Sequence, residues 1–143
     1  FAPRWTVGAL VRFHTAHKMT LLAHAPEIYR DMGRLVAGAK EADRAGLERE
    51  YRELFMQALE MMATTRKHTN VLMHMAGHFK RLLTDDARQE LVTSIDDYRK
   101  GLLPLVVPLT LIRHHVRSHR VEYLAGQVYL DPHPKELMLR NHV

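Results

Sequence analysis

Apolar residues recur three or four positions apart along most of the chain, which is the period of an α-helix with one buried face. This spacing predicts six helices, over residues 6–23, 26–37, 47–61, 65–83, 84–100 and 109–120. Thr6, Thr65 and Thr84 stand where N-caps are expected, since a threonine side chain accepts a hydrogen bond from the first turn. The alternation typical of strands is scarce, and "GQVYL" near the end is a short candidate. The pattern therefore predicts an all-α fold.

Nothing in the sequence marks a boundary between domains, because there is no internal repeat and no low-complexity linker. The polar stretch "AKEADRAG", residues 39–46, is expected to be the least ordered part. A short helical segment is expected at residues 134–141. We therefore predict one compact bundle of about six helices plus this C-terminal segment, with residues 1–143 as a single domain. Because the chain starts at Phe1 rather than at methionine, we expect a fragment of a longer protein.

The composition is that of a globular protein, with 46% hydrophobic and 26% charged residues. Cysteine is absent, which excludes disulfides, a thiolate nucleophile and any cysteine-ligated iron–sulfur or zinc site in this chain. No apolar run approaches the roughly 18 residues that a membrane helix needs, so we expect no membrane association. A cytoplasmic setting is the expectation that follows.

The net charge of +5 is unevenly distributed along the chain. Residues 1–65 carry nine Lys and Arg against eight Asp and Glu, whereas residues 66–120 carry ten against five. A basic second half favours a polyanionic partner such as nucleic acid. A basic surface without any such partner is the open alternative.

Three polar residues of the first predicted helix lie on its apolar stripe rather than opposite it. His14, His17 and Lys18 share a face with Leu10 and Leu21. Polar groups at such positions are either satisfied inside the core or line a cleft, because an unpartnered polar group is costly to bury. The sequence leaves satisfied core histidines, a ligand-binding cleft and a metal site as alternatives for this face.

Two later helices carry polar faces that contain no acidic residue. On the helix predicted at 65–83 this face holds Arg66, Lys67, Asn70, His74, Gly77, His78 and Arg81. A glycine inside a helix costs about 1 kcal/mol relative to alanine, so Gly77 suggests that something approaches closely there. On the helix predicted at 109–120 the corresponding residues are Thr110, Arg113, His114, Arg117 and Arg120.

Neither a metal site nor a nucleophile is predicted from the spacing. Two histidine pairs, 74 with 78 and 115 with 119, are four residues apart, but neither pair encloses a glutamate or has a third ligand nearby. Ser94 and Ser118 lack the glycines of a nucleophile elbow. The residues favour an anion-binding cleft, lined by three helices, that holds RNA phosphates by charge-assisted hydrogen bonds. An enzyme or small-ligand protein that uses His14 or His74 as a general base is the alternative.

Four blocks of the sequence resemble the YbgA-like domain family. They are "FHTAHKMTLLAHAPEIYRDMGRLV", "HTNVLMHMAGHFKRLL", "YRKGLLPLVVPLTLIRHHV" and "GQVYLDPHPKELMLRNHV", which together cover nearly the whole chain. The resemblance implies a helical domain that occurs alone or behind an iron–sulfur-dependent desulfidase of the thiouracil desulfurase type. The fused proteins are associated with removing sulfur from tRNA thiouridines, so the helical domain is expected to hold tRNA. An iron–sulfur cluster would belong to a fused or partner N-terminal domain, because this chain contains no cysteine.

The resemblance also suggests residues for binding. It brings in His24 from the first block, His68 and Lys80 from the second and Arg99 from the third, and His78 stands where relatives often have an aromatic residue. Together with the basic faces it gives this RNA-binding set: His14, His17, Lys18, Arg66, Lys67, His68, Asn70, His74, Lys80, Arg81, Arg113, His114 and Arg117.

Overall fold

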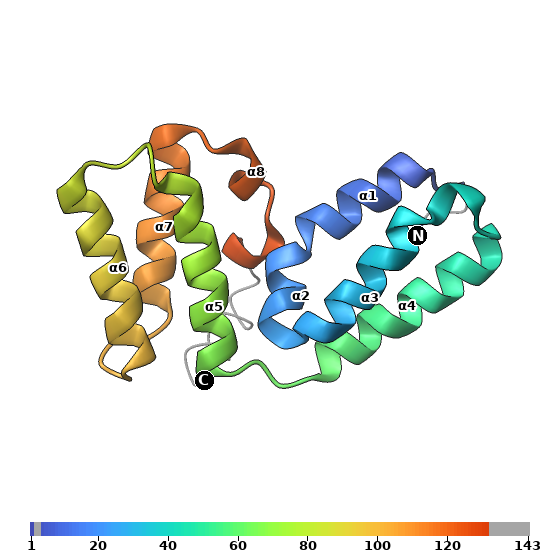
Figure 1. Ribbon diagram of the computed structural model, residues 1–143, viewed down its shortest axis with the longest axis horizontal. Helices are drawn as coiled ribbons and strands as arrows, with labels where there is room; N and C mark the ends of the chain where they lie inside the picture. The colour runs from blue at the N-terminus through green and yellow to red at the C-terminus, as the bar shows by residue number, and fades with distance from the viewer. Residues whose placement is uncertain (2–3, 132–143) are drawn as a thin grey trace. The chain divides into compact units, whose positions relative to one another are not determined.

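The computed structural model describes residue 1 and residues 4–131, and every regular element in this part of the chain is helical (Figure 1). The predicted all-α class is confirmed. No described helix is both long and apolar enough to cross a membrane. The segment predicted at residues 134–141 lies outside the described residues.

The helices group into two compact units, residues 1–62 and residues 63–143. The single domain expected for residues 1–143 stays a prediction. Unit 1 contains α1 (Val7–Ala16), α2 (Lys18–His24), α3 (Pro26–Ala37), η1 (Ala39–Glu41) and α4 (Arg44–Glu60). Unit 2 contains α5 (Thr65–Ala76), η2 (Gly77–Phe79), α6 (Asp85–Arg99), α7 (Val106–His119), α8 (Glu122–Ala125) and η3 (Val128–Leu130).

Unit 1 closes around its own apolar core, in which α3 packs on α4, α2 packs on both, and α1 packs on α3. The buried cluster consists of Leu10, Leu21, Ala25, Met32, Ala39, Leu47, Tyr51 and Ala58. The stretch expected to be least ordered is structured. Ala39 is buried in η1, and the Asp43 side chain accepts a hydrogen bond of 3.0 Å from the Gly46 N–H, so α4 begins three residues before the predicted start.

The single helix predicted over residues 6–23 is divided at His17. Thr6 is the N-cap as predicted, and its side chain accepts a 3.0 Å hydrogen bond from the Ala9 N–H. The His17 ring nitrogen Nδ1 lies 2.8 Å from the Phe13 carbonyl oxygen, which also accepts the His17 backbone N–H. A side chain that competes for a helix carbonyl is a recognised cause of a local break. As a result α1 ends at Ala16 and α2 begins at Lys18.

In the described part of unit 2, α6 runs opposite to α5 and α7 (Figure 1). Because α5 and α7 run the same way, their C-terminal ends lie at the same end of this unit (Figure 1). Thr84 caps α6 as predicted, whereas Thr64 rather than Thr65 caps α5. Pro108 lies in the first turn of α7, where the missing N–H costs no helical hydrogen bond. The candidate strand "GQVYL" is wrong, because residues 128–130 form the 3₁₀ turn η3.

Gly77 and Gly101 form a matched pair for testing the backbone of unit 2. Gly77 has a helical φ of −58°, and a Cβ added there meets nothing within 4 Å. Gly77→Ala should therefore raise the free energy of unfolding by about 0.4–1 kcal/mol, since alanine restricts the unfolded chain. Gly101 has a φ of +79°, so Gly101→Ala should lower it by about 1–2 kcal/mol. Denaturant titration followed by circular dichroism measures both, and effects of the same sign would contradict the two conformations.

Candidate functional site

The thirteen residues predicted to bind RNA divide between the two units. His14, His17 and Lys18 lie in unit 1, and the other ten lie in unit 2. The single cleft expected to be lined by all of them stays a prediction.

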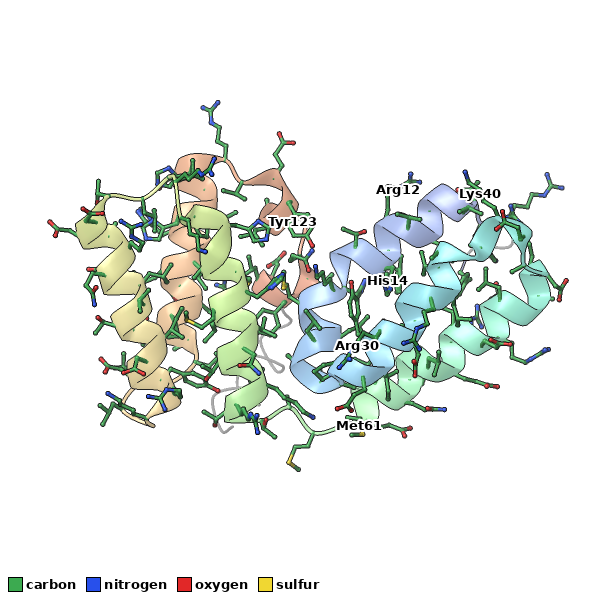
Figure 2. The ribbon with its side chains drawn as sticks, viewed as in Figure 1. Arg12, His14, Arg30, Lys40, Met61 and Tyr123 are labelled. Carbon is green, nitrogen blue, oxygen red and sulfur yellow. The ribbon has the colours of Figure 1, made fainter. Side chains whose placement is uncertain are left out.

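His14 is a core histidine of unit 1 (Figure 2). Only 7% of the residue is exposed, its Nδ1 lies 3.0 Å from the Tyr51 hydroxyl oxygen, and its ring stacks on Tyr29 at 4.8 Å between centroids. The other ring nitrogen, Nε2, faces Gly33, where an added Cβ would lie 3.9 Å away. The assignment of His14 as an RNA contact is therefore wrong, since the ring is held inside the protein. Burial, assisted by the charges of His17 and Lys18, lowers the pKa of His14.

His17 and Lys18 are partly buried and differ in how they are held. The His17 ring stacks on Phe13 at 4.1 Å between centroids, in addition to its hydrogen bond to the Phe13 carbonyl. Lys18 is the first residue of α2 and forms no ion pair with the part of the chain that the structure describes. Lys18 therefore stays a candidate for binding a phosphate, and His17 is largely engaged by its own helix.

His68 is the second wrong assignment, because it belongs to the core of unit 2. It is 1% exposed, and its Nδ1 lies 2.6 Å from the hydroxyl oxygen of Tyr129, which is itself fully buried. This bond ties α5 to η3. Like His14, His68 has no surface to offer to RNA. The sequence pattern could not distinguish the two situations, since a histidine on an apolar stripe fits both.

Most of the remaining predicted residues lie on the surface of unit 2. Arg66, Asn70, His74, Lys80, Arg81, His114 and Arg117 are exposed, and Lys67 and Arg113 are partly buried. Among the residues suggested only by family resemblance, His24 bonds through Nδ1 to the Met61 carbonyl at 2.8 Å, and Arg99 pairs with Asp96.

Gly77 is the C-cap of α5 and the first residue of η2, and its backbone has a helical conformation that any amino acid can adopt. An added Cβ would meet nothing within 4 Å, so no described neighbour requires a glycine here. The inference that something approaches closely at Gly77 stays a prediction.

Ring contacts gather at the C-terminal ends of α5 and α7. His78 stacks on Tyr123 with 5.1 Å between ring centroids, and His74 meets His78 edge-on at 6.0 Å. On α7, His115 contacts Phe79 at 5.9 Å, and burial, followed by the charges of His114 and His119, lowers its pKa. Sequence reasoning missed Tyr123, because its neighbour lies 45 positions away and only the path of α8 brings the two rings together. Among the described residues, no three or more His, Asp or Glu side chains are arranged to hold one metal ion.

Unit 1 also has an apolar hollow of about 340 Å³. Its lining consists of Arg4, Thr6 and the apolar side chains of Phe1, Trp5, Ala9, Leu10 and Phe13. Neither His14 nor Lys18 lines it, so this hollow is separate from the predicted polar site.

The lowered pKa of His14 predicts how stability changes with pH. In the unfolded chain His14 has a pKa near 6.5 and becomes protonated below that pH, whereas in the folded protein it stays neutral to lower pH. The free energy of unfolding should therefore fall as the pH drops from about 6.5 toward the lowered folded pKa. His14→Asn, which can keep a bond to Tyr51, should weaken this dependence. Tyr51→Phe should lower stability by about 1–2 kcal/mol at every pH yet keep the dependence, because burial is its main cause. Urea titrations across this range measure both, and an unchanged slope in His14→Asn would contradict the assignment.

Comparison with known proteins shows the family. Residues 18–134 match the model of the family described as "Protein of unknown function (DUF1722)". The chain is 36% identical over 137 residues to the "Uncharacterized protein YbgA" of Escherichia coli (strain K12). The aligned region covers 95% of this chain and 81% of that protein. No solved structure matches the chain. The chain therefore belongs to the DUF1722 family, that is, to the YbgA-like proteins.

Proposed function

We propose that this chain binds structured RNA through the basic side chains of unit 2. One observation carries the proposal, namely the uneven pairing of the cations in this unit. The cations of α6 are neutralised within that helix, Arg88 by Asp85, and Arg99 and Lys100 by Asp96. By contrast, a second group makes no ion pair or side-chain hydrogen bond to the described residues: Arg66, Lys80, Arg81, Arg113, Arg117 and Arg120.

Unpaired cations suit a phosphate backbone for a simple energetic reason. A cation that is already paired must lose its carboxylate before it contacts phosphate, whereas an unpaired cation only sheds water and counterions. Four of these six cations are arginines that lie in α5, just after η2 or in α7, namely Arg66, Arg81, Arg113 and Arg117. An arginine side chain can bind phosphate oxygens with two parallel hydrogen bonds. Because these cations are spread over several elements of unit 2, they favour a ligand with many phosphates over a single small anion.

The narrower part of the proposal is that the RNA is tRNA and that the chain serves a thiouridine desulfidase. It rests on the resemblance of the four sequence blocks to YbgA-like domains that are fused behind a desulfidase. Sulfur removal and any iron–sulfur cluster would then belong to a fused or partner domain, because this chain has no cysteine. Unit 2 would contribute substrate binding.

An enzyme that uses His14 or His74 as a general base is the competing function. Its one point of support is the lowered pKa of His14, which keeps the ring neutral near pH 7 as a general base requires. Against it, His14 is 7% exposed and its Nδ1 is engaged by Tyr51, so a substrate has little access to the ring. RNA binding is therefore the function that the geometry supports better.

Binding of labelled bulk tRNA, followed by fluorescence anisotropy at several salt concentrations, tests the proposal. The logarithm of the affinity should fall linearly with the logarithm of salt concentration. The double variant Arg81→Gln/Arg117→Gln should weaken binding and reduce the slope by roughly one for each phosphate that the variant no longer neutralises. The matched control is Lys100→Gln, because Lys100 is a cation of the same unit that already pairs with Asp96.

The possible outcomes separate the general proposal from its assignment to residues. Lack of binding even at low salt would refute RNA binding by this chain. Binding that Lys100→Gln weakens as much as the double variant does would refute the assignment to the unpaired cations. Equal competition by tRNA and by unstructured RNA of the same phosphate content would refute the preference for structured RNA.

A further inference from the structure

Two aromatic rings stack on the surface of unit 2 without belonging to its core. The His78 ring, in η2, lies 5.1 Å from the Tyr123 ring, in α8, with an angle of 24° between the ring planes (Figure 2 labels Tyr123). His74 contacts the edge of His78 at 6.0 Å. We call these three residues the aromatic ledge. Tyr123 is 38% exposed, and both histidines are also exposed.

The elements that carry the ledge are fixed by other side chains. Phe79, the residue after His78, is 1% exposed, and Leu124, the residue after Tyr123, is fully buried. These two apolar residues anchor η2 and α8 to the core, so the adjacent rings are free to face outward. The ledge therefore exposes aromatic surface on two elements that neighbouring residues anchor in the core.

Two cations that make no ion pair with the described residues lie close in sequence to the ledge, one just after η2 and one at the end of α7. Lys80 follows His78 by two residues, and Arg120 precedes Tyr123 by three, and neither pairs with an acid among the described residues. One carboxylate, that of Glu122, is adjacent to Tyr123, and the nearest acid at the start of α6, Asp85, pairs with Arg88. Exposed flat rings with cations nearby in the chain suit a nucleotide of an RNA strand, whose base is flat and whose ribose is joined to a phosphate on each side.

From this arrangement we propose that the aromatic ledge stacks an unpaired RNA base while Lys80 and Arg120 bind the flanking phosphates. The inference rests on the proposed function and narrows it, because it names the part of the RNA that unit 2 recognises. Bases within a duplex already stack on their neighbours and offer no free face, whereas loops and single strands present bases to aromatic side chains. The recognised element is thus a single-stranded loop or end rather than a helical stem.

Three fluorescent ligands with the same number of phosphates test the inference: an oligouridine, an abasic ribose–phosphate oligomer and an RNA duplex. The 143-residue chain should bind oligouridine more tightly than the other two. Tyr123→Ala should lower the affinity for oligouridine about five- to a hundredfold, the usual effect of losing one stacked base. The same variant should leave the affinity for the abasic oligomer and the salt slope unchanged. Tyr123→Phe, which keeps the ring and removes the hydroxyl, is the matched control and should bind as the unmodified chain does.

Each outcome supports or overturns the inference. Tyr123→Ala binding as tightly as the unmodified chain, or weakening the abasic oligomer equally, would overturn it and leave the proposed function standing. Failure of the chain to bind any of these ligands or tRNA would overturn both. If circular dichroism shows that Tyr123→Ala does not fold, photo-crosslinking of the unmodified chain to oligouridine that contains 5-iodouridine replaces it. Adducts at Tyr123 or His78 would support stacking, and adducts confined to other residues would overturn it.

Discussion

A hydrogen bond between a buried histidine and a buried tyrosine joins distant segments in each unit, and the surrounding apolar residues pack around it. In unit 1, His14 of α1 bonds to Tyr51 of α4, and in unit 2, His68 of α5 bonds to Tyr129 of η3. Apolar contacts tolerate small shifts of one helix along another, whereas a buried polar pair does not, because an unsatisfied group costs about 1–3 kcal/mol. These bonds therefore set the register of the helices that they connect, and they explain why polar residues occupy apolar stripes.

The local part of this fold is predictable because its causes lie within about four residues of each other. Apolar spacing identifies the helices, and the Thr6 and Thr84 caps stand where threonine followed by a helical pattern places them. The errors come from interactions that the apolar pattern does not contain. His17 divides a helix by bonding to the Phe13 carbonyl, and Asp43 extends α4 into a stretch whose composition suggests disorder. The division into two units is also absent from the pattern, since each helix has an apolar face whichever neighbour covers it.

Candidate site residues are harder to predict, for a reason that the histidines make clear. A histidine on an apolar stripe is either bonded inside the core or directed into a cleft, and what decides is a partner far away in sequence. Tyr51 lies 37 residues from His14, and Tyr129 lies 61 residues from His68. Conversely, the helical pattern predicts the exposed basic residues, because a helix face without apolar residues is expected to lie on the surface. Tyr123 was missed because its significance depends on the path of α8.

The helix dipole separates cations that stabilise their own helix from cations that do not. The C-terminal end of α7 carries partial negative charge, so Arg117 in its last turn stabilises that helix regardless of any ligand. Arg66 and Lys67 are different, because they lie in the first turn of α5, which contains no acid and where the helix dipole opposes a positive charge. The helix dipole therefore gives no reason for a cation at Arg66. Under the proposed function, a polyanionic partner would supply a reason that helix stability does not.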